Sequence, residues 1–357
     1  MAITIQVAAV GPFAPSLDFV NTSASVDRSG QTEFSFEIKP DICAYTRGDK
    51  RLVTTDVARA EIIIEFKWHA TDDPFCKPYP LPGDPNRSTF LRDSNTGRDT
   101  LGQITSYAAA QLGSQFRTHI YSVLIVKDYA RLIRWDRTGA IVTEAIPYDS
   151  DRTLAEFFRR YHKAPPKYRG VDTTVTVPTD REIRLARKCL DLEDNVPLVK
   201  MTVPAEGSER SYVAAAPKAQ PYTPPGRATR GFVAYDLRRR RKVFVKDTWR
   251  VDLPDIEREG ETYELMAKAQ VRNIAPCSAA GDIGDHHTVT HLYANKPWAC
   301  KREKDLIPHQ HYCLVLDVVG DDLPKFPSSW EMLRYIVHAL EGKRSERTAS
   351  AQYLPPF

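Results

Sequence analysis

Runs of apolar and β-branched residues predict most of the strands in the second half of this chain. Two such runs flank a polar turn, at 231–237 and 242–246, and they predict a β-hairpin. Residues 311–319 form a run apolar enough for a buried strand, and shorter candidates lie at 196–203 and 211–215. A helix is predicted over 258–268. The second half is therefore expected to contain a β-hairpin, further strands and a helix between them.

A second helix is predicted near the end of the chain. Ser328 to Glu331 form a capping box, and apolar residues recur on one helix face after it, at Trp330, Leu333, Val337 and Leu340. Gly342 is the expected end of this helix, because glycine commonly terminates helices.

The first half alternates strands and helices. Residues 61–68 predict a central strand, 119–126 another, and 130–135 with 140–145 a hairpin. Helices are predicted over 100–112, opened by Asp99 or Thr100, from 151 onward, and from a capping box at Thr179 and Glu182. Residues 72–95 contain five prolines and several charges, and they are expected to form a long loop.

Length and local composition predict a chain of two domains, since 357 residues exceed the usual size of one core. We expect an α+β protein with a loose N-terminal arm at 1–30 and an α/β domain at 31–163. A linker with a bridging helix then covers 164–195, a second domain 196–342, and a divergent tail 343–357.

Composition and charge narrow the class of protein. Apolar residues make up 42% and charged residues 27% of the chain, which is typical of globular proteins. No apolar run approaches a membrane span, the start lacks a basic secretory n-region, and no C-x-x-C occurs among six cysteines. We therefore expect no membrane partner, free thiols and an intracellular location, cytoplasmic or nuclear. A net charge of +4 does not by itself require nucleic acid.

The hairpin of the second half carries a candidate phosphate-binding motif. Gly226, Ala228, Gly231 and Val233 follow the pattern G-x-G-x-x-G-x-V with one glycine replaced. Small residues at a turn let backbone N–H groups approach phosphate oxygens. Lys246 ends the following Val-Phe-Val-Lys run, where a lysine can hold the phosphates of a nucleotide.

Two further segments would complete a nucleotide site. Glu261, on the helix at 258–268, is expected to pair with Lys246, and Glu264 is the alternative partner if the helix is offset by a turn. A resemblance to protein kinases would make the strand at 311–319 the one that leads into the hinge. It implies Leu316 as the gatekeeper and Asp317 to Val319 as the residues that offer backbone groups to adenine.

These motifs resemble the fungal-type protein kinases, a family expanded in mushroom-forming fungi. The similar segments include GRATRGFVAYD, EGETYELM, NIAPCSAAGD, HYCLVLDVVG and FPSSWEMLRYIVHAL. The resemblance implies a kinase N-lobe made of an antiparallel sheet and an αC helix, with ATP as ligand, Mg²⁺ as its companion ion and a protein as substrate or partner. The family's activity is ATP-dependent phosphorylation of Ser or Thr.

The chain departs from the family after the last predicted helix. No H-R-D occurs in it and no D-F-G follows, so the base, the second-metal asparagine and the Mg²⁺ aspartate are missing. The resemblance therefore predicts a truncated member without the C-lobe. We expect it to hold ATP weakly and to transfer no phosphoryl group.

A different constellation occupies the first half. Lys39-Pro40-Asp41 precedes an apolar run, and Glu65 and Lys67 form E-x-K on one face of the predicted central strand. This order resembles the PD-(D/E)XK nuclease fold, in which Asp41 and Glu65 would hold a divalent metal and Lys67 would orient water or stabilise charge. Gln103 and Tyr107, one helical turn apart, resemble the Q-x-x-x-Y pair of RecB-like members.

Three functions therefore remain open: a nucleotide-binding kinase relative, a metal-dependent nuclease acting on nucleic acid, and a non-catalytic interaction module. Two side features are weaker. The basic run 238–242 is best explained as a solvated turn, although a nuclear-import signal or a phosphate contact is the alternative. His309, His311 and Cys313 share a strand face and could ligand a metal, but no second ligand pair has suitable spacing.

Overall fold

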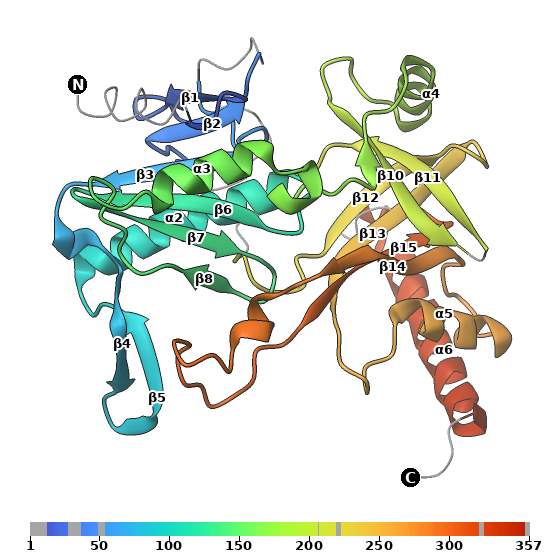
Figure 1. Cartoon of the computed structure of the whole chain (residues 1–357). Coiled ribbons are helices and arrows are strands. Elements are labelled where there is room, and N and C mark those ends of the chain that lie inside the picture. Colours follow the sequence, from blue (N-terminus) through green and yellow to red (C-terminus); the bar gives the residue numbers. More distant parts are fainter. Residues whose placement is uncertain are drawn as a thin grey trace. The chain divides into compact units, whose positions relative to one another are not determined.

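The computed structural model describes residues 13–27, 37–48, 54–205, 207–218, 223–320 and 325–353 (Figure 1). The chain folds into two compact units. The first contains residues 1–173 together with 216–228 and 287–309, and the second contains 174–215, 229–286 and 310–357. As the pattern predicts, both strands and helices are abundant, and the protein is of the mixed α+β type.

The first unit is built on a six-stranded sheet of order β1-β2-β3-β6-β7-β8. Its strands are β1 (Leu17–Asn21), β2 (Ile42–Thr46), β3 (Ile62–Lys67), β6 (Ile120–Val126), β7 (Tyr129–Trp135) and β8 (Ala140–Val142). Neighbours are antiparallel except β3 and β6, which are parallel. A parallel pair needs a crossover connection, and α2 (Asn95–Ser114) lies between these two strands in the chain.

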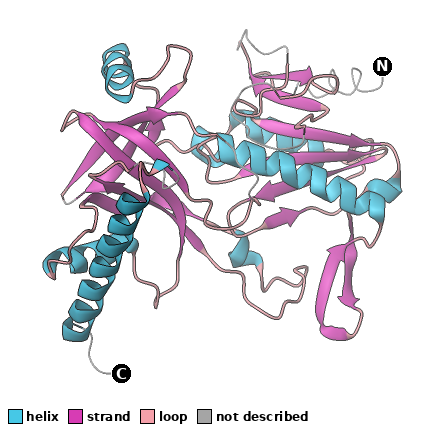
Figure 2. Cartoon of the chain, turned by 180° about the vertical axis from the view of Figure 1, so that it is seen from behind, coloured by secondary structure: helices cyan, strands magenta, loops and turns pink. Residues whose placement is uncertain are grey.

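Helices α2 and α3 (Thr153–Lys163) cover opposite faces of this sheet (Figure 2). Ile62 and Ile64 pack in one buried cluster with Phe158 of α3, whereas Ile63 packs in another with Tyr107 of α2. This follows from the strand period of two, which sends successive side chains to opposite faces. A strand buried on both faces explains why β3 reads as a continuous apolar run.

Three local predictions for the first unit need correction. The N-terminal arm predicted at 1–30 contains β1, which pairs with β2, while residues 1–12 and 28–36 lie outside the described residues. Helix α2 begins at Asn95 with Ser94 as its cap, since the Ser94 hydroxyl accepts from the Gly97 N–H, and not at Asp99 or Thr100. The loop predicted over 72–95 contains a hairpin, β4 (Phe75–Leu81) and β5 (Asp84–Leu91).

Two segments from the second half also belong to the first unit, whereas the sequence predicted one continuous domain over 196–342. The reason is a set of hydrogen bonds to the β7–β8 turn. The Gly226 N–H donates to the Arg137 carbonyl, and the buried Asp136 carboxylate accepts from the N–H groups of Val289 and Thr290. The 3-10 turn η4 (Thr290–Tyr293) lies in this second segment.

The second unit contains a seven-stranded sheet of order β14-β15-β13-β12-β11-β10-β9. Its strands are β9 (Val175–Thr176), β10 (Leu198–Ala205), β11 (Ser208–Ala215), β12 (Arg230–Asp236), β13 (Arg241–Val251), β14 (Cys277–His287) and β15 (His309–Leu316). The hairpin predicted from 231 to 246 is confirmed as β12 and β13. The strand predicted at 311–319 corresponds to β15.

The helices of the second unit lie where the sequence predicts them, and α6 is longer than predicted. Helix α4 (Asp180–Leu190) has the predicted capping box of Thr179 and Glu182, and α5 is Glu259–Lys268. Helix α6 is Ser329–Tyr353, so it does not end at Gly342, and the residues predicted as a tail continue it. Gly342 lacks the positive φ of a terminating glycine, which explains why the helix continues.

Two expectations from composition can be checked. All six cysteines lie within the described residues, and none of them forms a disulfide. Within the same residues, no helix combines the length and the apolar character needed to cross a membrane.

Candidate functional site

Lys246 of β13 forms an ion pair with Glu259 of α5. Its Nζ lies 2.6 and 2.8 Å from the two carboxylate oxygens. The Lys246 side chain is 25% exposed and the Glu259 side chain is 31% exposed, so both are largely buried. The predicted pairing of Lys246 with Glu261 is therefore wrong. The acidic partner is the first residue of α5 and not its third.

Glu261 has a structural role instead. Its carboxylate accepts from the Arg258 N–H at 3.1 Å, which closes a capping box at the start of α5. Glu264, the alternative partner, is exposed and lines a cavity of about 460 Å³ between α5, β14 and the end of β10. Neither carboxylate makes an ion pair with Lys246 in this structure.

The candidate glycine-loop residues are divided between the two units. Gly226 and Ala228 belong to the first unit and have positive φ values of 116° and 41°. The Gly226 N–H is already bonded to the Arg137 carbonyl. In the second unit, Gly231 stands directly opposite Lys246 in the register of the hairpin. A Cβ on Gly231 would lie 2.6 Å from the Phe244 ring, so the ring occupies the space that only glycine leaves.

Val233 and the predicted hinge residues lie on the same sheet. Val233 is 44% exposed, Leu316 ends β15, and Val319 follows it in a loop. The Asp317 N–H donates to the Pro276 carbonyl at 2.9 Å. This bond uses one of the backbone groups that the sequence assigned to adenine.

The Asp317 carboxylate is held by the β12–β13 turn. Arg239 Nη1 lies 2.7 Å from it and Arg241 Nη2 lies 2.6 Å away. Burial alone would raise the pKa of Asp317, but the guanidinium groups of Arg239 and Arg241 help to lower it below its usual range. Two residues of the basic run 238–242 therefore fix the end of β15. This contact could not be predicted from local patterns, because its partners are 76 to 78 positions apart in the chain.

In the first unit, the residues predicted as a nuclease site are brought together. Lys67 Nζ lies 2.6 Å from Glu65 Oε1 and 2.7 Å from Gln103 Oε1. Gln103 Nε2 donates to the Tyr107 hydroxyl at 2.8 Å, and that hydroxyl donates to the Lys39 carbonyl. Asp41 directly precedes β2 and accepts from the Phe66 N–H at 2.8 Å. One chain of contacts therefore joins β3, α2 and the segment before β2.

Burial determines the electrostatics of this first-unit site. Glu65 is 3% exposed, and its burial, reinforced by the nearby Asp41 carboxylate, raises its pKa to about 7. One of its oxygens, Oε2, has no hydrogen-bond partner among the residues that the structure describes. Burial and the charge of Glu65 also raise the pKa of Tyr107. The carboxylates of Asp41 and Glu65 repel each other, and one buried oxygen of Glu65 is unpaired within the described part of the chain. This arrangement fits a divalent cation that prefers oxygen ligands.

A shallow cavity of about 410 Å³ lies beside these residues. Its lining comprises Glu37, Lys39, Gln103, Ser106 and Tyr107. Polar side chains therefore face an open space next to the Glu65–Lys67 pair.

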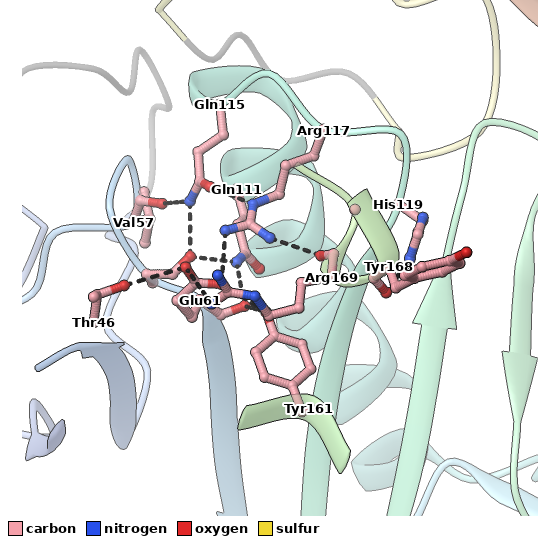
Figure 3. A network of polar contacts seen from close by, with 12 residues as sticks. Thr46, Val57, Glu61, Gln111, Gln115, Arg117, His119, Tyr161, Tyr168 and Arg169 are labelled. Atoms are coloured by element: carbon pink, nitrogen blue, oxygen red, sulfur yellow. Dashed lines mark hydrogen bonds and ion pairs between the residues drawn. The ribbon is translucent and has the colours of Figure 1, made fainter. Parts of the chain in front are cut away.

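A separate network in the same unit was not predicted (Figure 3). Glu61, at the start of the central strand, binds Arg117 at 3.1 Å and Arg169 at 3.2 Å and accepts from the Tyr161 hydroxyl at 2.7 Å. Burial would raise the pKa of Glu61, but the Arg117 guanidinium and its other partners hold it below its usual range. This carboxylate links the sheet to α3 and to the two connecting segments that carry Arg117 and Arg169. Its oxygens form ion pairs with both arginines and accept a hydrogen bond from Tyr161.

Comparison with known proteins agrees with the second-half motifs. The fungal protein kinase family matches residues 89–350, about three-quarters of the chain. No curated protein and no solved structure matches it. Because the match covers well over half of the sequence, the chain belongs to the fungal protein kinase family.

Proposed function

We propose that the second unit binds ATP through Lys246, and that these residues hold the nucleotide without transferring its phosphoryl group. The observation that carries the proposal is the ion pair between Lys246 and Glu259. A lysine on a strand, oriented by a glutamate on the next helix, is the arrangement by which kinases position the phosphates of ATP.

The order of elements supports the same proposal. Gly231 lies across the hairpin from Lys246, α5 follows the lysine strand, and β15 lies next to that strand in the sheet. Leu316 and Val319 at the end of β15 would contact adenine. The bonded N–H of Asp317 leaves its carbonyl as the group that can face the base.

Nucleotide binding can be tested with a fluorescent ATP analogue. We expect Lys246→Ala to abolish binding, because its ammonium is the charge that faces the phosphates. Lys242→Ala is a matched control, since Lys242 lies on the same strand and is exposed. Equal binding by both variants and the wild type would disprove a role for Lys246. A phosphotransfer assay with Mg-ATP separates binding from catalysis.

A second candidate function, metal-dependent cleavage of nucleic acid, is favoured by the first-unit constellation. Asp41 and Glu65 would supply oxygen ligands to Mg²⁺, and Lys67 would stabilise charge on the phosphate being cleaved. The unpaired buried oxygen of Glu65 is the specific observation behind it. Lys67 bound to Gln103 is already held in place for this role.

The test is cleavage of single- and double-stranded DNA and RNA with Mg²⁺ or Mn²⁺. Glu65→Gln should abolish cleavage because it removes a metal-binding charge while keeping the side-chain shape. Glu37→Gln, at the exposed rim of the cavity, should leave cleavage unchanged. If the wild type cleaves nothing and binds neither metal, this candidate is eliminated, and the first proposal is unaffected.

A further inference from the structure

In the seven-stranded sheet of the second unit, three buried side chains of different types that can each bind a metal lie close together. Asp247 of β13 and His311 and Cys313 of β15 are each at most 5% exposed. One oxygen, one ring nitrogen and the sulfur all lie within 4.8 Å of one another. His311 and Cys313 were grouped by sequence with His309, but the structure supplies Asp247 as the third member. Asp247 joins the group because β13 lies next to β15 in the sheet, and the sequence alone does not show this strand pairing.

Each of these side chains is oriented by its surroundings. Arg230 of β12 holds Asp247 Oδ2 at 2.6 Å and so leaves Oδ1 directed toward His311 and Cys313. The Cys313 sulfur lies 3.6 Å from Oδ1. Burial would raise the pKa of Asp247, but Arg230 and His311 hold that carboxyl ionised.

The His311 ring is fixed on both sides. Trp249 stacks on it with ring centroids 5.1 Å apart, and the His286 ring is nearly parallel to it. His286 Nδ1 lies 3.2 Å from His311 Nδ1, while His311 Nε2 faces Asp247. An outer partner on one ring nitrogen with the other nitrogen facing a ligand group is typical of metal-binding histidines.

We propose that Asp247, His311 and Cys313 bind a zinc ion. Thiolate, imidazole and carboxylate together suit Zn²⁺, whereas Mg²⁺ and Ca²⁺ prefer oxygen ligands alone. Ligands about 2.0–2.3 Å from a tetrahedral zinc are separated by roughly 3.5 Å. The sulfur–oxygen distance of 3.6 Å already fits this value. The direct hydrogen bond between His311 and Asp247 has to open when the ion enters.

Zinc binding would displace hydrogens from two ligand atoms. The Cys313 S–H bond breaks, its proton passes to solvent, and a Zn–S bond forms. His311 Nε2 gives up the hydrogen that Asp247 accepts, so that this nitrogen binds zinc while the neutral ring carries its proton on Nδ1 and donates it to His286 Nδ1; Asp247 binds as the carboxylate. Affinity should therefore fall as pH is lowered. The ion would cross-link β13 to β15. Asp247 follows Lys246 directly, so the two side chains point to opposite sheet faces, and the zinc site is independent of nucleotide binding.

Cobalt substitution tests the proposal on the full chain, because a thiolate bound to Co²⁺ gives a near-ultraviolet charge-transfer band. We expect one equivalent of Co²⁺ to produce this band and Zn²⁺ to displace it. Cys313→Ser should remove the band, whereas Cys277→Ser, which changes a partly buried cysteine of the same unit, should retain it. Glu65→Gln should also retain it, which separates this site from the first-unit carboxylates.

Competition with a chromophoric chelator measures the contribution of each histidine. His311→Gln should lower Zn²⁺ affinity more than His286→Gln, whose expected loss is about 10- to 100-fold as an outer partner. His287→Gln, at an exposed position, is the matched control and should leave affinity unchanged. In the wild type, Zn²⁺ should also protect Cys313 from alkylation but not Cys277, a readout that does not depend on variant folding. Absence of the band, its persistence in Cys313→Ser, or equal alkylation with and without Zn²⁺ would overturn the proposal.

Discussion

Lys246 and Glu259 meet across 13 positions of the chain, with the lysine on a strand and the glutamate at the first position of α5. The pair ties the start of α5 to the sheet. Gly260 explains which residue of the helix faces the lysine. Its N–H donates to the Tyr312 hydroxyl at 2.8 Å, and a Cβ there would lie 2.5 Å from that oxygen. This close approach fixes the rotation of α5.

The first prediction follows from that rotation. Glu259→Gln should weaken binding of an ATP analogue more than Glu261→Gln, because only the first substitution frees Lys246. Both variants should lose less than about 1 kcal/mol of unfolding free energy, since partly exposed ion pairs contribute little and glutamine can still close the capping box. Binding isotherms and urea titrations measure the two effects. A larger loss of affinity in Glu261→Gln would show that the helix is rotated differently in solution.

Local patterns predicted most strands of the two sheets, but not β1, β2, β9 or β14, and they predicted the gathering of Glu65, Lys67, Gln103 and Tyr107. Alternation along β3 and one turn of α2 sufficed, because a parallel βαβ unit brings that strand and that helix together. The features that the sequence did not predict depend on contacts between residues far apart in the chain. The rotation of α5 depends on Tyr312 of a distant strand, and the place of 287–309 depends on the buried Asp136.

A second prediction concerns the buried Glu61 network. Glu61→Gln should lower the free energy of unfolding by about 3–5 kcal/mol, because Arg117 and Arg169 would keep their charges in a buried site without a carboxylate. Glu156→Gln is the control. Glu156 makes ion pairs with Arg159 and Arg160 on the exposed part of α3, where water screens the charges, and its loss should lower the free energy of unfolding much less than the loss of Glu61 does. Urea denaturation of both variants would reveal the difference, and equal effects would contradict the structural role of Glu61.

A third prediction concerns pH. Burial, reinforced by Arg134, lowers the pKa of His119 to about 4. The ring is held neutral, with Nε2 near the Tyr168 carbonyl and Nδ1 near the Thr118 hydroxyl (Figure 3). In the unfolded chain a histidine has a pKa of about 6.5 and binds the proton more readily. The His119 contribution to stability is therefore present above about pH 6.5 and is lost as pH falls toward 4.

Unfolding free energies measured at several pH values between 7 and 4 would show this loss. His119→Gln should flatten the slope across that window, since glutamine does not titrate. His287→Gln, at an exposed position, should leave the slope as in the wild type. A slope unchanged by His119→Gln would mean that His119 binds protons equally well in the folded and unfolded chain.

The last prediction compares two glycines with the same backbone conformation. Gly48 and Gly170 both have a φ of 88°, but their surroundings differ. A Cβ on Gly48 would meet no atom of the described residues within 4 Å, so Gly48→Ala should cost only the left-handed strain of about 1–2 kcal/mol. A Cβ on Gly170 would lie 1.9 Å from the His119 carbonyl oxygen, so Gly170→Ala also forces the backbone apart. We expect a loss above about 3 kcal/mol for Gly170→Ala in urea denaturation. Equal losses would show that the segment carrying Gly170 does not approach β6 as closely as this structure has it.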